Sequence, residues 1–120
     1  MSKMLAVERM CTALAADNGT VYSDSKKFRS TTGFITILVT SSAAGSVTIT
    51  QQCSKNNIDW YDPIDSDANA LGQVIAAMGA TTYYIQCSPV LAPYIRYKVV
   101  EDGTLATTVT LDLIYQEESS

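Results

Sequence analysis

Residue types that usually carry chemistry are sparse in this chain. It has no histidine, so we expect neither a Ser-His-Asp triad nor a Cys-His pair, and general acid–base catalysis loses its usual residue. The six glycines are scattered, with no Gly-x-Ser-x-Gly sequence and no glycine-rich phosphate loop among them. The sequence therefore predicts a protein that is not an enzyme and binds no cofactor.

The acidic run after Pro63 is the remaining candidate for a metal site. Residues 65–69 read Asp-Ser-Asp-Ala-Asn, like the start of an EF-hand, but Ala70 and Ala76 occupy the positions that need glycine and glutamate. Another calcium geometry would use three carboxylates: Asp62, Asp65 and Asp67. The simpler interpretation is a solvated loop whose Asp and Asn side chains bind their own backbone, and we expect no metal.

Three cysteines, Cys11, Cys53 and Cys87, show no metal-binding spacing. We interpret them as reduced, small apolar side chains. A disulfide between Cys53 and Cys87 is the alternative, because both residues end strand-like runs.

Two pairs of adjacent aromatic residues occur, Trp60-Tyr61 and Tyr83-Tyr84. In an extended segment neighbouring side chains point to opposite faces, so we expect one exposed ring in each pair, with Tyr61 and Tyr84 as the candidates. Exposed rings of this kind can form a sugar platform, which makes a carbohydrate-binding module the alternative function. Arg96 is expected to pair across strands with Asp59 or Asp112.

Alternating apolar and polar residues predict strands along most of the chain. The predicted strands are Phe34–Thr40, Ser46–Ser54, Gln73–Met78, Thr81–Cys87, Tyr94–Glu101 and Ala106–Tyr115. Ala43-Ala44-Gly45 and Asp102-Gly103 predict hairpin turns between their neighbours. The pattern indicates an all-β, antiparallel two-sheet β-sandwich of about seven or eight strands, immunoglobulin-like or jelly-roll. Five residues are expected in its core: Val47, Ile49, Val109, Leu111 and Leu113.

One domain accounts for the 120 residues. We predict an N-terminal arm or short helix over 1–19, a β-sandwich over 20–116 and a frayed tail over 117–120. Met4–Ala16 fits a helix, a strand or an arm, and Asn69–Met78 is the other possible helix. The first segment is too apolar for a free tail, so we expect these residues to lie in an interface: Met4, Leu5, Val7, Met10 and Leu14.

Charge and hydropathy exclude two classes of partner. The net charge is −4 and the only basic cluster is Lys26, Lys27 and Arg29, so we expect no nucleic acid. The chain start is not a signal peptide, and no apolar run reaches the about 18 residues of a membrane span, so we expect synthesis in the cytoplasm and no membrane.

Three segments resemble a class of small tailed-bacteriophage virion proteins: Val47–Trp60, Ala92–Val99 and Thr107–Leu111. That class has a "VTI-Q-S-DG--W" hairpin, a "P-YIR-KV" strand and a final "TVT" strand in a compact β-sandwich. Asn56-Asn57 replaces the Asp-Gly turn, and asparagine can adopt the positive φ that this turn needs. The resemblance implies a virion structural protein, most simply a capsid decoration or cement protein, and otherwise a tail or head-completion component. It also implies a homo-oligomer, with a trimer favoured, that binds the major capsid protein or another virion protein and resides in the virion after synthesis in the host cytoplasm.

Overall fold

The computed structural model describes residues 3–16, 19–27, 35–42, 46–87, 92–101 and 107–118. These residues form nine strands: β1 (Lys3–Ala16), β2 (Thr20–Tyr22), β3 (Lys26–Lys27), β4 (Ile35–Ser41), β5 (Val47–Ser54), β6 (Gln73–Met78), β7 (Thr82–Cys87), β8 (Tyr94–Glu101) and β9 (Thr107–Glu118). Within the described ranges there is no helix, so neither Met4–Ala16 nor Asn69–Met78 is helical. A search of these residues likewise finds no helix that could span a membrane.

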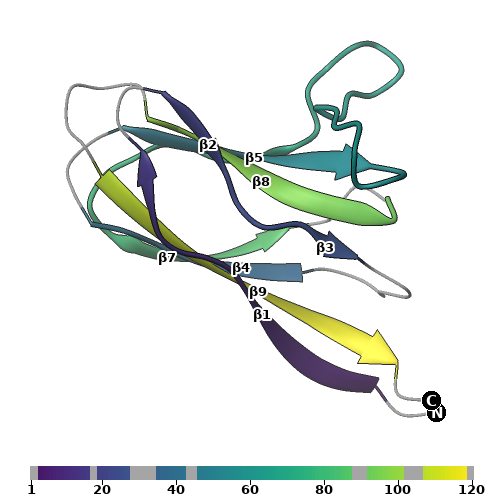
Figure 1. Cartoon of the computed structure of the whole chain (residues 1–120), viewed down its shortest axis with the longest axis horizontal. Coiled ribbons are helices and arrows are strands. Elements are labelled where there is room, and N and C mark those ends of the chain that lie inside the picture. Colours follow the sequence, from purple (N-terminus) through teal and green to yellow (C-terminus); the bar gives the residue numbers. More distant parts are fainter. Residues whose placement is uncertain are drawn as a thin grey trace.

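Two antiparallel sheets face each other (Figure 1). The first sheet has the order β1-β9-β4-β7, and the second has the order β2-β8-β5-β6, with β3 also pairing with β8. The predicted all-β, two-sheet antiparallel sandwich is confirmed. Its strands are more numerous than predicted only because one edge strand is divided: β2 and β3 pair with opposite ends of β8.

The strand order is that of a jelly roll. With β2 and β3 counted as one strand, the pairs are nested: β1 with β9, β2/β3 with β8, β4 with β7, and β5 with β6. Such nesting arises when a long antiparallel ribbon rolls up into two sheets. An immunoglobulin-like sandwich instead pairs several consecutive strands, so the topology decides between the two predicted architectures.

Both hairpin predictions are wrong. β4 and β5 lie in different sheets, and so do β8 and β9, so neither pair of strands forms a hairpin. The central residues of these turns, Ala43-Ala44-Gly45 and Asp102-Gly103, lie outside the described residues. Turn residues indicate where a strand ends, but they do not determine which sheet the next strand joins.

The core follows the predicted faces. The five predicted core residues are all fully buried, at 0% exposure: Val47, Ile49, Val109, Leu111 and Leu113. Alternate residues of β8, which are Ile95, Tyr97 and Val99, pack with them between the sheets. This agreement has a simple cause, since a strand's side chains alternate strictly between the two faces of a sheet.

The segment predicted as an arm or short helix is a strand of the first sheet. β1 pairs with β9 from Lys3 to Ala16, and Met10 is buried in the core at 1% exposure. Its alanine and leucine content favours a helix, but pairing with β9 overrides that weak preference. The strand bulges near Ala13, whose φ is 48°, and the backbone N–H of Ala13 donates to Thr110 Oγ1 at 3.0 Å.

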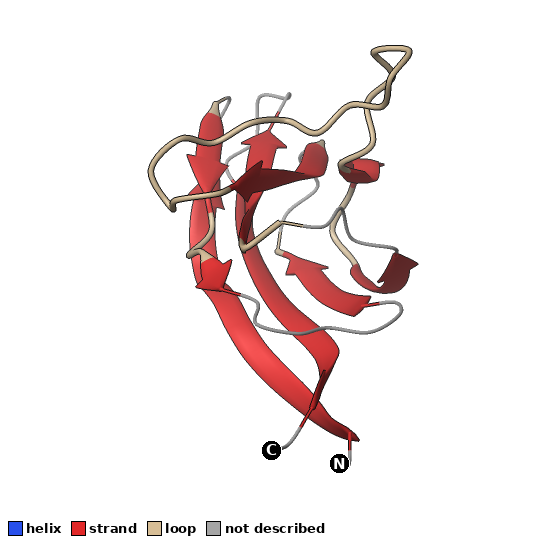
Figure 2. Ribbon diagram, turned by 90° about the vertical axis from the view of Figure 1, so that its right-hand side faces the viewer, coloured by secondary structure: helices blue, strands red, loops and turns tan. Residues whose placement is uncertain are grey.

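At the chain ends, β1 and β9 form a two-stranded ribbon that extends beyond the rest of the sandwich (Figure 2). Glu118 pairs with Lys3, and Glu117 pairs with Met4. The predicted frayed tail over 117–120 is therefore wrong for its first two residues, which belong to β9 because β1 supplies their backbone partners. The remaining two residues lie outside the described ranges.

Candidate functional site

The acidic loop between β5 and β6 is organised by its own backbone. The Asp65 carboxylate accepts the backbone N–H groups of Asp67 and Asn69, both at 2.9 Å. These bonds, foremost the one from Asn69, lower the pKa of Asp65. No group of three or more His, Cys, Asp or Glu side chains suited to a metal occurs among the described residues. The arrangement is the solvated loop of the simpler sequence interpretation.

Asp62 is turned away from the other two carboxylates and toward the second sheet. It accepts hydrogen bonds from Lys98 Nζ and Gln52 Nε2, both at 2.9 Å. The Lys98 bond, followed by the Gln52 bond, lowers the pKa of Asp62. The carboxylate therefore fastens the loop to β5 and β8.

Arg96 is the centre of a cluster on the outer face of the second sheet. Its guanidinium carbon lies 4.1 Å from the ring centre of Tyr22 and 4.5 Å from that of Trp60. Its Nε donates to Gln52 Oε1 at 2.8 Å. We call the following residues the Arg96 cluster: Tyr22, Gln52, Trp60, Asp62, Arg96 and Lys98.

The prediction that Arg96 pairs with Asp59 or Asp112 is wrong. Asp112 binds Arg9 across β1 and β9, and Asp59 accepts a hydrogen bond from Asn56 at 3.0 Å. Sequence reasoning missed the cluster because its members come from β2, β5, β8 and a loop, which only the fold brings together. The one available signal was Trp60, the single tryptophan, placed next to a polar turn.

The two predicted exposed aromatics are exposed, Tyr61 at 65% and Tyr84 at 69%. Tyr83 is also exposed, at 42%, whereas we predict only one exposed ring in the pair Tyr83-Tyr84. Both rings reach solvent because β7 is an edge strand, with no neighbouring strand on one side. Tyr84 belongs to the first sheet, whereas Tyr61 bridges to Cys53 at the end of the second. The exposed rings therefore do not form one platform.

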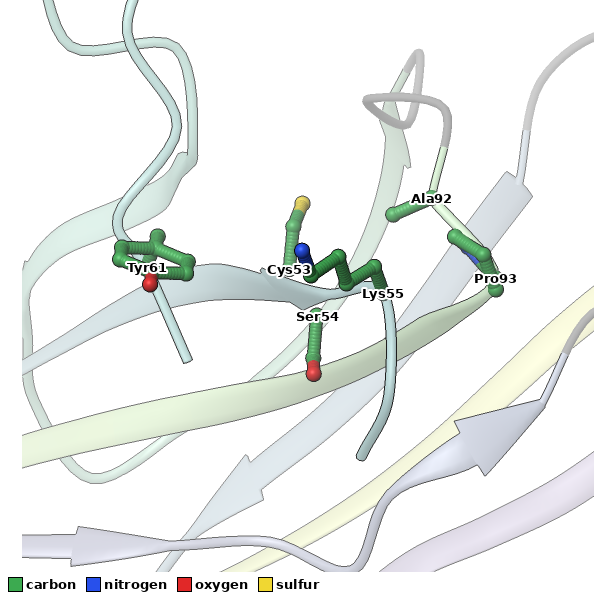
Figure 3. A pocket seen from close by; sticks show the side chains of 6 residues that line it. All are labelled: Cys53, Ser54, Lys55, Tyr61, Ala92 and Pro93. Carbon is green, nitrogen blue, oxygen red and sulfur yellow. The ribbon is translucent and has the colours of Figure 1, made fainter. Parts of the chain in front are cut away.

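A shallow pocket of about 260 Å³ lies beside Tyr61 (Figure 3). Its lining residues are Cys53, Ser54, Lys55, Tyr61, Ala92 and Pro93. The Cys53 thiol points toward the space between Tyr61 and Ala92, whereas Ser54 points the opposite way (Figure 3). Burial raises the pKa of Cys53, so its thiol stays protonated near neutral pH and is a poor nucleophile. Cys53 is free, so the alternative Cys53–Cys87 disulfide is not formed.

The predicted interface residues divide between two environments. Leu5 and Val7 are exposed, at 73% and 65%. Met10 is buried and Leu14 packs against the core, so these two stabilise the protein's own fold. The side chain of Met4 lies outside the described residues. The division follows from the strand geometry of β1, in which alternate residues face outward.

Leu5 and Val7 belong to a larger apolar surface on the outer face of the first sheet. Val7 is paired with Ile114 of β9, and Leu38 of β4 is paired with Tyr84 of β7. Ile114 and Leu38 are both partly buried and are diagonal neighbours across β9 and β4. We call these residues the apolar stripe: Leu5, Val7, Leu38, Tyr84 and Ile114.

Comparison with known proteins supports the fold. No protein-family model and no curated protein matches the chain. A crystal structure of PirA matches with a TM-score of 0.48 and 18% identity, over 96% of this chain and 93% of the other. A structure of the infectious bursal disease virus Gx strain matches with a TM-score of 0.51 and 12% identity. That match covers 99% of this chain and 33% of the viral one, so this chain has the fold of part of a viral chain.

Proposed function

We propose that this protein is a virion structural protein, and specifically a capsid decoration protein that docks on the shell without catalysing a reaction. The observation that carries the proposal is the apolar stripe on the outer face of a jelly roll. Jelly rolls build viral capsid domains as well as lectin domains. The motif resemblance to tailed-phage virion proteins and the shared fold with a viral chain support the same role.

The composition of the stripe suits docking. Leu5, Val7 and Tyr84 are each at least 65% exposed, and monomeric proteins rarely expose contiguous apolar patches larger than about a few hundred Å². The Arg9–Asp112 ion pair lies beside the stripe and provides a polar rim, as protein interfaces commonly have. The partner is the major capsid protein or another virion protein, and copies of the chain assemble as a homo-oligomer, with a trimer favoured. A tail or head-completion component would use the same surface.

The carbohydrate-binding alternative rests on exposed Tyr61 and Tyr84. A sugar platform needs rings that converge on one face, and these two lie on different parts of the sandwich. The geometry therefore favours docking over sugar binding.

The test changes the stripe without touching the core. Deletion of residues 1–16 is unsuitable, because it would remove buried Met10 and Ala16. The double variant Leu5→Lys and Val7→Lys places two charges on the exposed stripe. Thr20→Lys, at an exposed position of the second sheet, is the matched control.

Each protein is mixed with shells of its virus prepared without it, and bound protein is measured by co-sedimentation. We expect wild type and Thr20→Lys to bind to saturation and the double variant to lose at least about tenfold in affinity. Equal binding by the double variant contradicts docking through the stripe. Failure of wild type to bind shells, combined with saturable binding to a glycan array, assigns the carbohydrate-binding alternative.

A further inference from the structure

The guanidinium of Arg96 contacts two aromatic rings, which we call the clamp. Tyr22 approaches from β2 on one side of β8, and Trp60 approaches from the loop after β5 on the other. Two ring centres within 4.5 Å of one carbon leave the guanidinium plane little freedom. The side chain is half-buried, so its position is set before any ligand arrives.

A chain of hydrogen bonds then occupies one edge of the same group. Nε of Arg96 donates to the Gln52 carbonyl, and the Gln52 amide donates to Asp62. Asp62 is also the acceptor for Lys98, so its carboxylate is engaged and does not reach the guanidinium. Within the described part of the chain, the two terminal nitrogens Nη1 and Nη2 of Arg96 have no hydrogen-bond partner.

These two nitrogens form the half of the guanidinium that fits a carboxylate. Their N–H groups lie in one plane and can bind both oxygens of a carboxylate at once. The clamp holds that plane in advance, so a ligand meets an ordered donor pair and costs less conformational entropy. The stack on Trp60 also fastens the loop to the sheet, but this role uses the faces of the guanidinium and leaves the Nη edge available.

The charges of the cluster and of the whole protein favour a ligand with a single negative charge. Asp62 and Lys98 neutralise each other, which leaves the charge of Arg96 uncompensated within the cluster. The protein as a whole carries −4, and Asp59 is the residue next to Trp60. The net negative charge of the protein disfavours phosphates and polyanions more strongly than a single carboxylate.

We propose that Arg96 is a receptor for one carboxylate, presented by an Asp or Glu side chain of a protein partner. The site lies on the second sheet, separate from the apolar stripe. That the partner is a protein rests on the docking role proposed above. A sugar acid is disfavoured because Tyr22 and Trp60 each give one ring face to the guanidinium.

The single tryptophan supplies a direct assay, since Trp60 touches the guanidinium that would bind the probe. N-acetylglutamate methylamide, in which the side-chain carboxylate is the only charge, is titrated into the purified protein at constant ionic strength, and Trp60 fluorescence is recorded. We expect a saturable change with a dissociation constant in the millimolar range. N-acetylglutamine methylamide, which has the same shape but no charge, should give no saturable change.

Two variants test whether the probe binds at Arg96. Arg96→Lys keeps the charge but lacks the fork, so it should weaken binding by at least about tenfold. Lys27→Gln removes a charge from the edge of the same sheet, at a residue outside the cluster, and should change the affinity less than about twofold. Circular dichroism verifies that both variants fold, and the comparison of the two methylamides needs no variant at all.

Several outcomes overturn the proposal. An identical response to the methylamides of N-acetylglutamate and N-acetylglutamine, or an Arg96→Lys affinity equal to wild type, refutes carboxylate recognition. Tighter binding of inorganic phosphate refutes the preference for a single charge, and tenfold tighter binding of glucuronate reassigns the site to acidic sugars. Because the probes are small molecules, failure here leaves the shell-binding test of the stripe unaffected.

Discussion

Leu111 offers a stringent test of the core assignment. It lies in β9, which is hydrogen-bonded to β1 on one side and β4 on the other, where its partners are Cys11 and Val39. Its side chain is 0% exposed. Leu111→Ala therefore removes buried carbon atoms from the middle of a sheet whose backbone is held on both sides.

The expected loss follows from this confinement. Leucine-to-alanine changes in cores cost about 2–5 kcal/mol, and the cost rises where the surroundings cannot collapse into the cavity. With strands fixed on both sides we expect about 3–4 kcal/mol, which lowers the melting temperature by roughly 12–16 °C at about 4 °C per kcal/mol. Leu111→Asp buries an unpaired charge, so it should exceed the total stability of about 5–15 kcal/mol and abolish folding.

Thr110→Asp is the matched control, one residue away on the opposite face. Thr110 is partly exposed, and its hydroxyl oxygen accepts the Ala13 N–H, which a carboxylate can also accept. We expect a loss below about 1 kcal/mol. Urea unfolding, monitored by Trp60 fluorescence and circular dichroism, gives the free energies. If Leu111→Asp and Thr110→Asp cost the same, the assignment of the two faces is wrong.

Three further changes test other parts of the structure. Gly72→Ala should cost about 1–3 kcal/mol in urea unfolding, because an added Cβ would lie 2.5 Å from a backbone oxygen of β5; unchanged stability would contradict this close approach. At pH 8 iodoacetamide should modify Cys53 well before Cys11, since burial raises the pKa of Cys11 to about 11; equal rates by mass spectrometry would refute the burial. Asp62→Asn should remove about 0.5–1 kcal/mol at pH 6, a modest value because the Lys98 pair is partly exposed. The pKa of Asp62 in the folded state lies below its ordinary value of 3.8. The stability difference between wild type and Asp62→Asn should therefore persist above pH 3.8 and vanish as the pH falls through the lowered pKa. A stability difference that does not change with pH would exclude the ion pair as its cause.

The sequence by itself determined six of the nine strands, their faces and the centre of the core. Val109, Leu111 and Leu113 could be assigned to the core because alternation in a strand is a local property, with a period of two residues. The turn at Asn56-Asn57 was predictable for a similar reason, since asparagine tolerates positive φ, and Asn57 has a φ of 62°. Asp65 was likewise correctly interpreted as a loop residue that binds its own backbone.

Only the tertiary structure decided which strands pair. Backbone hydrogen bonds are the same for every residue, so nothing in β4 or β5 specifies that they belong to opposite sheets. The same limit explains β1, whose residues favour a helix until β9 supplies hydrogen-bond partners along its length. It also explains the Arg96 cluster, because Tyr22 and Trp60 are 38 positions apart in the sequence and meet only when β2 and β5 flank β8. Contacts between distant segments depend on how the ribbon rolls up, which is a property of the whole chain and of no single segment.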